Sequence, residues 1–196
     1  MQKNHGQEVE FFRQADKGCK FRVTENDIVN QTDVKTYLNT VTDINHEGLT
    51  LQQLNNVASI LGLGVNTYFA CGRGETEAIC DDPDTKKRLT EAVPSSDFVL
   101  KTAAQFRRVA SGLIQRSVTG VIVNYHLASL GYTELHGHFS PLAAYHAESD
   151  RFLVMDVWWY TPPAWVETKK LFRAMSTRDD GSHMPRGMLH IHELVV

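Results

Sequence analysis

A histidine and an aspartate, His138 and Asp156, lie near the two ends of the segment GHFSPLAAYHAESDRFLVMDV, residues 137–157. The segment predicts a hairpin, and an even-sum register would place both side chains on one face within diagonal reach. Asp156 has the apolar neighbours Met155 and Val157, where a carboxylate needs a hydrogen-bond partner. A histidine that is hydrogen-bonded to a carboxylate is typical of nucleophilic acyl transfer, in which the histidine is the general base and the carboxylate orients it. On spacing alone, a turn-capping aspartate and an exposed histidine would be the better interpretation.

The nine histidines include two His-x-His pairs, His136 with His138 and His190 with His192. On a strand, residues i and i+2 share a face, so each pair could chelate a metal ion. A closed site needs more ligands, and no carboxylate or thiolate lies at a motif spacing beside either pair. The sequence therefore predicts no metal site in the protein itself.

The sequence contains three cysteines, Cys19, Cys71 and Cys80. Their odd number argues against a fully paired disulfide framework, and their spacing does not match a zinc ribbon. The default interpretation of each is an inert buried thiol.

The composition of the 196 residues is that of an ordinary globular protein, with 42% hydrophobic and 22% charged residues. The net charge of -3 and the pI of about 6.3 make nucleic acid a poor partner. No apolar run reaches the roughly 18 residues of a membrane helix, so no membrane is expected. The first twenty residues have no apolar core of a signal peptide, which predicts a cytoplasmic protein.

In the first half, residues 49–61 predict a helix, with Thr50 and Gln53 as a capping box. A strand is expected over 63–70. The charged stretch 71–96 is interpreted as an irregular insertion, and a second helix is expected over 97–114, capped by Ser95 or Ser96.

The second half predicts strands over 121–125, 138–145, 151–157 and 187–194. The pair Pro162-Pro163 interrupts the chain, and Thr168 is expected to cap a short helix through Met175. Early helices followed by adjacent antiparallel strands favour an α+β fold over a parallel α/β fold.

The stretch VIVNY…GHFSPLAAYHAESDRFLVMDVWWYTPPAWV…LFRAM…RG resembles the phytochelatin synthase family, the papain-like γ-glutamylcysteine dipeptidyl transpeptidases, and above all its short bacterial members. The match is dense over 121–189 and weaker but collinear over 21–54, whereas 71–96 has no counterpart. The resemblance implies a papain-like α+β fold, with residues 1–196 as the C-terminal part of one domain.

By this resemblance, His138 matches the catalytic histidine and Asp156 the aspartate that orients it. Asn124 and Arg186 match positions near the bound γ-glutamylcysteine. A guanidinium suits a carboxylate, because its donors form a bidentate fork. The alternative for Arg186 is a surface arginine before an edge strand.

The family's activity implies an acyl transfer on glutathione. A cysteine thiolate attacks the Cys-Gly amide, glycine leaves, and the γ-glutamylcysteinyl thioester passes to another glutathione or to water. Glutathione and γ-glutamylcysteine peptides are the implied partners, and a homodimer is left open. The chemistry requires no cofactor; Cd and Zn ions enter as glutathione thiolate complexes, which links the family to metal detoxification and metal binding.

The sequence departs from the family at the nucleophile. The family's cysteine begins a central helix, in a segment like Q-x-x-Y-C-G-x-A-S, and residues 1–20 do not match it. Three explanations follow. The chain is the C-terminal part of a longer protein, which we favour because the absent helix would leave apolar sheet surface bare; it is a cysteine-less relative that binds γ-glutamyl thiols, metal or a partner; or Cys71 or Cys80 supplies the thiol.

A second departure follows Asp156, where Trp158, Trp159 and Tyr160 replace a basic residue of the family's pattern. These aromatic residues either change the acceptor side of the site or serve packing, which is the usual role of adjacent aromatic side chains.

Overall fold

The computed structural model describes residues 8–9, 23–42, 48–72, 79–93, 95–116, 120–158 and 160–193. The chain divides into two compact units, Met1–Gly48 and Leu49–Val196. In the smaller unit, the short strands β1 and β2 pair antiparallel and are followed by two helices: β1 Glu8–Val9, β2 Val23–Thr24, α1 Glu25–Val29 and α2 Thr32–Val41. The interpretation of residues 1–196 as a single domain stays a prediction.

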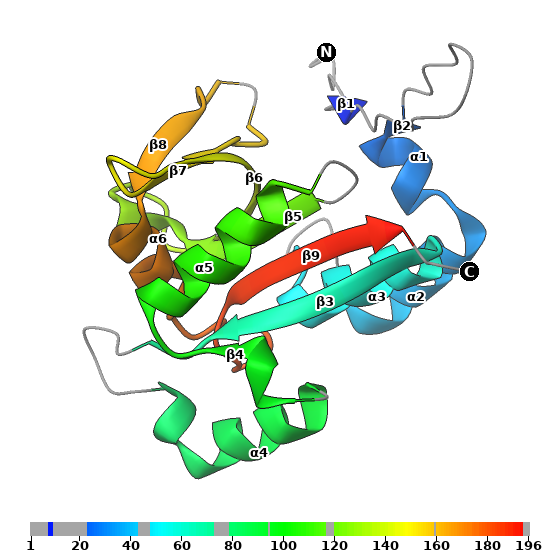
Figure 1. The fold of residues 1–196 in the computed structure, drawn as a ribbon. Coiled ribbons are helices and arrows are strands. Elements are labelled where there is room, and N and C mark those ends of the chain that lie inside the picture. Colours follow the sequence, from blue (N-terminus) through cyan, green and yellow to red (C-terminus); the bar gives the residue numbers. More distant parts are fainter. Residues whose placement is uncertain are drawn as a thin grey trace. The chain divides into compact units, whose positions relative to one another are not determined.

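The larger unit is built on a seven-stranded sheet with the order β4-β3-β9-β5-β6-β7-β8 (Figure 1). Its strands are β3 Leu63–Ala70, β4 Val99–Leu100, β5 Gly120–His126, β6 Gly137–His146, β7 Arg151–Val154, β8 Ala164–Glu167 and β9 Gly187–Glu193. Its helices are α3 Leu51–Ile60, α4 Pro83–Ala92, α5 Ala103–Ile114 and α6 Thr168–Met175, with single 3-10 turns at Ile79–Asp81, Ser96–Phe98 and Leu127–Leu130.

The sheet is mixed but mostly antiparallel. Only the pairing of β3 with the two-residue strand β4 is parallel among the strands that the structure describes. The α+β class predicted from the order of helices and strands is therefore confirmed. In the described ranges, no helix combines the length and the apolar character needed to cross a bilayer.

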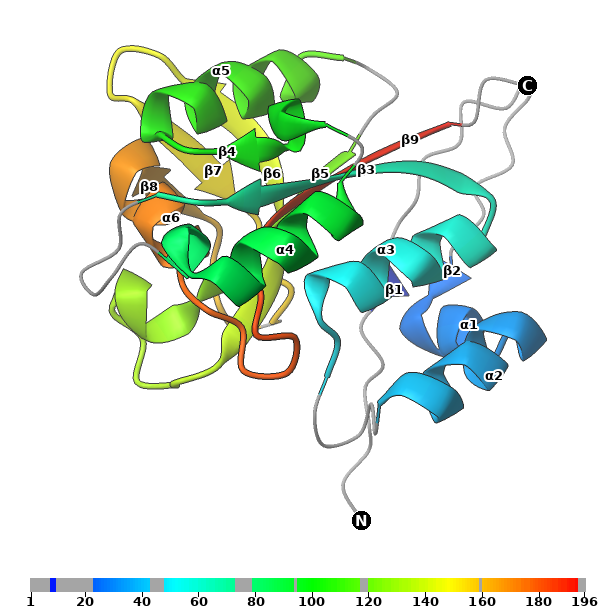
Figure 2. The same ribbon diagram turned by 90° about the horizontal axis from the view of Figure 1, so that it is seen from below.

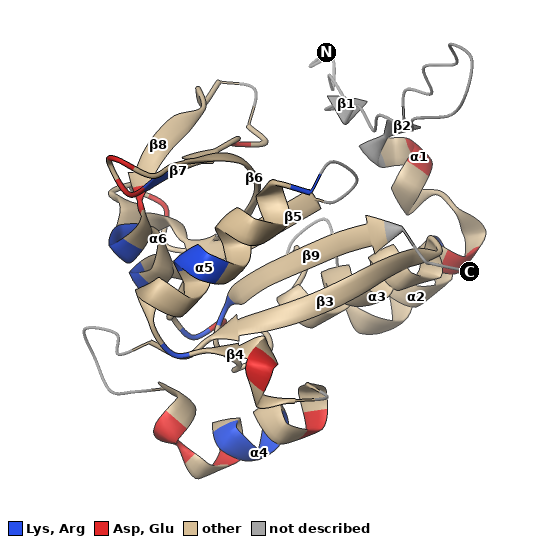
Figure 3. Ribbon diagram, viewed as in Figure 1, with Lys and Arg blue, Asp and Glu red and all other residues tan. Residues whose placement is uncertain are grey.

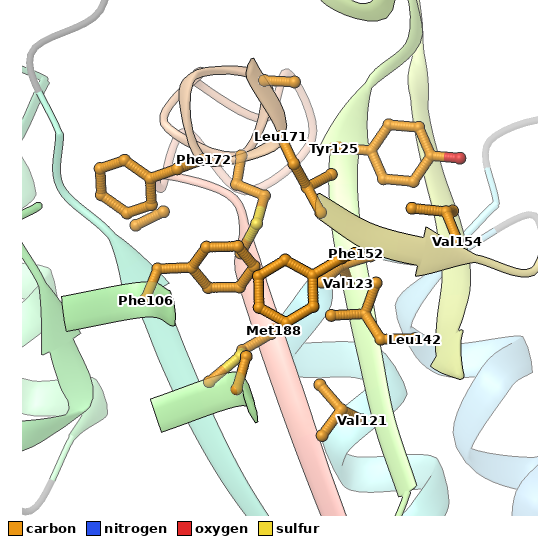
Figure 4. Close-up of a cluster of buried hydrophobic side chains, with 14 of the residues drawn as sticks. Phe106, Val121, Val123, Tyr125, Leu142, Phe152, Val154, Leu171, Phe172 and Met188 are labelled. Atoms are coloured by element: carbon orange, nitrogen blue, oxygen red, sulfur yellow. The ribbon is translucent and has the colours of Figure 1, made fainter. Parts of the chain in front are cut away.

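Two hydrophobic clusters hold the helices on opposite faces of the sheet. In Figure 2, α5 lies on one side of β3 and β9, and α3 and α4 lie on the other. On the side of α5 and α6, the aromatic rings of Phe106, Phe152 and Phe172 meet in the centre of the core (Figure 4). On the other side, the buried members are Leu51, Phe69, Leu89, Met184 and Leu189.

The second face of the sheet is less completely covered than the first. Val65, Ile122, Phe139 and Ile191 pack against the second cluster but are only partly buried. By contrast, Val121, Val123 and Tyr125 on the first face are buried.

Local sequence signals account for several helix boundaries. Thr50 and Gln53 form the predicted capping box of α3. The predicted helix over 97–114 is wrong at its start, because Val99–Leu100 pairs with β3 and α5 begins at Ala103, capped by Thr102 and Gln105. Thr168 does not cap α6; it is the first helical residue, and its hydroxyl bonds to Asp150.

The insertion over 71–96 is less irregular than predicted, because it contains α4. Asp82 caps this helix by accepting from the Thr85 amide, and Pro83 occupies the first helical position, where its missing N–H has no cost. Leu89 packs α4 into the second cluster, and the helix has a basic stretch, residues 86–88, between the acidic Asp84 and Glu91 (Figure 3).

A disulfide joins Cys71 to Cys80, with their Cα atoms 5.6 Å apart. The interpretation of these two cysteines as inert buried thiols is therefore wrong. The bond ties the end of β3 to the turn before α4, across a sequence separation of nine residues. Cys19 lies outside the described residues.

The turn between β6 and β7 is fixed to α6 through Asp150. This residue adopts a positive φ of 51°, and its carboxylate accepts from the Thr168 hydroxyl at 2.6 Å and from the Tyr145 hydroxyl at 3.0 Å. Partial burial alone would raise the pKa of Asp150, but the hydrogen bonds from Thr168 and Tyr145 outweigh it and hold the pKa below its ordinary value.

We expect Asp150→Asn to lower the free energy of unfolding by about 1 kcal/mol at neutral pH, because the half-exposed carboxylate loses charge-assisted bonds while asparagine tolerates the positive φ. A carboxylate with a lowered folded-state pKa stabilises the protein above its unfolded pKa of about 4 and loses this effect as the pH falls. Urea unfolding of both proteins at neutral and at acid pH should therefore give a difference that shrinks in acid. A difference that is independent of pH would contradict the assignment.

Candidate active site

The hairpin that carries His138 and Asp156 contains a β-bulge. Near the turn, Tyr145 lies opposite Phe152, but farther along Leu142 lies opposite Val154, so β6 has one extra residue between these pairs. If the register near the turn continued without this bulge, the side chains of His138 and Asp156 would point to opposite faces of the sheet. With it, position 156 falls on the face of His138.

The predicted strand over 151–157 is too long, because β7 ends at Val154 and Asp156 lies just beyond it. The Met155 amide still donates to the Pro141 carbonyl oxygen at 2.9 Å, so the pairing with β6 continues for one more bond. The chain then turns, because the Trp158 amide donates to Asp156 Oδ1 at 2.9 Å. This bond holds the carboxylate at the end of the hairpin.

The central feature of the site is a hydrogen bond of 2.9 Å between His138 Nε2 and Asp156 Oδ1. Both side chains are buried, with exposed fractions of 7% and 3%. A carboxylate can only accept, so Nε2 carries the proton and Nδ1 holds the lone pair. No residue in the described ranges bonds to Nδ1. The hydrogen bond predicted from the sequence of the hairpin is therefore present. Nδ1 is the ring nitrogen that could exchange a proton with a nucleophile.

Aromatic rings enclose the imidazole of His138. The indole of Trp158 lies with its ring centroid 4.4 Å away, and Tyr125 approaches edge-on at 5.8 Å. Tyr125 also shares a hydrogen bond of 3.0 Å with Ser140, and its burial raises the pKa of its hydroxyl. Trp158 therefore packs on the candidate catalytic histidine, which is one of the two roles considered for it; Trp159 lies outside the described residues.

Tyr132 was not singled out from the sequence, although its hydroxyl reaches Asp156 Oδ2 at 3.5 Å. It follows the 3-10 turn Leu127–Leu130, and no motif spacing relates it to Asp156. A cavity of about 580 Å³ opens beside this contact. Tyr125, Tyr132, Asp156 and Lys170 are among the residues that line it. The candidate catalytic dyad, His138 and Asp156, thus borders a cavity on the side of the Asp156 carboxylate.

Asn124 and Arg186, the two predicted substrate-binding residues, lie together. Arg186 donates from Nη1 to the Asn124 side-chain oxygen at 3.3 Å and forms an ion pair with Asp179. Both Asn124 and Arg186 are buried, and β9, which follows Arg186, lies between β3 and β5. The alternative of a surface arginine before an edge strand is therefore wrong.

The pair of His138 and Asp156 and the pair of Asn124 and Arg186 lie on opposite sides of β6. The guanidinium of Arg186 lies so close over Gly137 that a Cβ there would overlap it, and the next residue, His138, points to the other face. The Nε of Arg186 is buried and has no partner among the described residues. A molecule that touched both pairs would pass around the end of β6 at Gly137.

No free thiol occurs in the part of the chain that the structure describes. Its two cysteines, Cys71 and Cys80, are joined in the disulfide, and a disulfide sulfur carries no thiolate. The explanation in which one of them serves as the nucleophile is therefore wrong for this oxidised form. The other two explanations stay predictions.

A family model described as "Phytochelatin synthase" matches residues 13–188. "Glutathione gamma-glutamylcysteinyltransferase 3" of Lotus japonicus is 38% identical over 94 residues, which are 47% of this chain and 19% of that protein. The proteins named "Glutathione gamma-glutamylcysteinyltransferase 1" of Triticum aestivum and of Arabidopsis thaliana are 40% and 34% identical over 35% and 46% of this chain. These matches cover 14% and 19% of those proteins, so the chain spans about a fifth or less of the curated relatives it matches.

Proposed function

Because this chain belongs to the phytochelatin synthase family, we propose that it adopts a papain-like fold and carries the proton-transfer half of a site that transfers γ-glutamylcysteine from glutathione. The observation that carries the proposal is the buried hydrogen bond of 2.9 Å between His138 and Asp156. It fixes the tautomer of the imidazole and leaves Nδ1 as the base, which is the arrangement that activates a thiol.

The chemistry begins when Nδ1 of His138 takes the proton of a cysteine thiol. The thiolate attacks the carbonyl carbon of the Cys-Gly amide, and the imidazolium gives the proton to the amide nitrogen as glycine leaves. Water or the amine of another glutathione then attacks the thioester, with Nδ1 accepting its proton and the thiol restored at the end. The thiol comes from outside the described residues.

The guanidinium of Arg186 supports a role in binding the substrate. It is a buried cation next to Asn124, and its Nε has no partner in the described ranges, so a donor is left for a substrate carboxylate. Asp179 already occupies Nη1 and holds the guanidinium in place. The proton transfers need no cofactor, and heavy-metal ions such as Cd²⁺ and Zn²⁺ take part as thiolate complexes of glutathione.

The test is incubation of the 196-residue chain with glutathione under reducing and non-reducing conditions. Released glycine and γ-glutamylcysteine are measured by mass spectrometry. The proposal expects little or no release from this chain alone, whose residues 1–20 do not match the family's cysteine segment. It expects release of both products from a longer form that supplies this segment, at the same rate in Cys71→Ser/Cys80→Ser as in the wild type. Release that required Cys71 or Cys80 would contradict the assignment of the nucleophile to another cysteine.

A second candidate is a module that binds γ-glutamyl thiols without turning them over. It is favoured by one observation: both described cysteines are locked in a disulfide. Calorimetric titration with glutathione separates the two functions. In a form that supplies the nucleophilic thiol, saturable binding without glycine release supports the module, release supports the transferase, and the absence of both would contradict both proposals.

A further inference from the structure

Three side chains on adjacent strands of the sheet converge away from the catalytic dyad. Asn66 on β3 lies opposite His190 on β9, and His192 is two residues farther along β9, on the same face. The amide nitrogen of Asn66 lies 3.5 Å from His190 Nδ1 and 3.5 Å from His192 Nε2. One atom of Asn66 is therefore shared between nitrogens of two imidazole rings.

The sheet does not satisfy the hydrogen-bonding groups of His190. The residue is 4% exposed, and in the described ranges its Nδ1 has only the long contact with Asn66; its Nε2 is buried with no partner there and does not face Asn66. Buried polar groups in proteins are nearly always paired, so this ring calls for an explanation beyond packing.

The backbone makes room for the second ring. The imidazole of His192 lies so close over Gly64 that any Cβ at this position would overlap it. Gly64 is the cross-strand partner of His192, so the missing side chain lets the ring lie flat on β3 beside Asn66. The two imidazole rings are 5.1 Å apart with an angle of 35° between their planes.

The spacing of these atoms fits a metal ion. In a tetrahedral site with bonds of about 2.1 Å, neighbouring ligand atoms lie about 3.4 Å apart. Both measured distances to the Asn66 amide are 3.5 Å. The oxygen and nitrogen of an amide occupy equivalent positions after a half-turn, so rotation of the Asn66 amide places Oδ1 where Nδ2 is drawn.

We propose that His190 Nδ1, His192 Nε2 and Asn66 Oδ1 bind one divalent transition-metal ion of the zinc and cobalt class, with water as the remaining ligand. Imidazole nitrogens favour these ions. In the described residues, no three of the His, Cys, Asp and Glu side chains converge, which is why the third ligand is an amide. The positive charge of Arg116, which acts on His190, weakens the site.

The test is a titration of the metal-stripped chain with Co²⁺ alone, followed by its visible absorption, and with Zn²⁺ by calorimetry. We expect binding of one ion with the intense bands of tetrahedral cobalt. His192→Ala should weaken binding by at least about tenfold, since even groups that only support metal ligands contribute that much. Asn66→Asp, which supplies a charged oxygen ligand, should tighten binding by about tenfold or more.

The matched control is His136→Ala, which disrupts the other His-x-His pair and should leave the affinity unchanged. Circular dichroism shows whether each variant is folded, and Asn66→Asp tests the site even if His192→Ala fails to fold. Three results would overturn the proposal: no binding by the wild type, equal affinity in Asn66→Asp, or binding that is lost in His136→Ala.

Discussion

In a form of the protein that supplies the nucleophilic thiol, we expect His138→Ala to lower the release of glycine from glutathione by about 10²–10⁴-fold, because general acid–base catalysis contributes a factor of this size. In the proposed reaction, His138 removes the thiol proton and returns it to the leaving amine, so its loss affects both halves of the transfer. The measurement is the initial rate of glycine release at saturating glutathione, for the wild type and the variant side by side.

Two further variants make this experiment specific. Asp156→Asn keeps an oxygen that accepts from Nε2 and from the Trp158 amide, so it should retain more activity than Asp156→Ala, which removes the acceptor of both bonds. His146→Ala is the matched control, because His146 is an exposed histidine at the other end of β6. A folded His138→Ala protein with the wild-type rate would disprove the role of His138.

Phe152→Ala should lower the free energy of unfolding by about 3–5 kcal/mol, the usual cost of emptying a buried phenylalanine site. Phe152 is fully buried on β7, and the centroid of its ring lies 5.0 Å from that of Phe106 (Figure 4). The ring of Tyr145 lies 4.8 Å from it on the other strand of the hairpin. Removal of the Phe152 ring leaves a cavity between α5 and the hairpin. Equilibrium urea unfolding followed by circular dichroism measures the loss.

The control for this variant is Leu135→Ala, because the Leu135 side chain is 76% exposed and its removal should change the stability by less than about 0.5 kcal/mol. A loss below about 1 kcal/mol in Phe152→Ala would show that the core around this ring repacks without a cavity. Since β7 leads directly to Asp156, the same variant should also weaken the hydrogen bond to His138.

Where local signals decide the secondary structure, the sequence alone is sufficient to predict it. The capping box at Thr50 and the β-branched and aromatic strand Leu63–Ala70 need no tertiary information, and both are present. The predicted helix begins too early, because Val99–Leu100 pairs with the edge of β3 instead of joining α5. This long-range pairing outweighs the apolar helical stripe. β8 was missed for a similar reason, since its pairing with β7 follows a proline pair that suggested only a break.

The candidate site shows the same division. The motifs GHFSPLAAY and MDV, through their resemblance to the family, predict the contact between His138 and Asp156, which is present. The catalytic role of this contact is still a proposal. The burial of Arg186 could not be predicted, because it depends on Gly137 lying beneath the guanidinium on a strand distant in sequence. The contact of Tyr132 with Asp156 depends on the path of a loop, which has no periodic signature.

The extra residue in β6 between Leu142 and Ala144 means that length changes in the two strands of the hairpin have unequal effects. A deletion of this residue would leave a regular ladder in which Leu142 still lies opposite Val154, so His138 and Asp156 would stay on one face of the sheet. A single deletion in β7 would instead shift the pairing by one residue and turn Asp156 to the other face. A related sequence that lacks one residue in β7 should therefore lose the contact between the histidine and the aspartate, whereas one that lacks only the bulge residue should keep it.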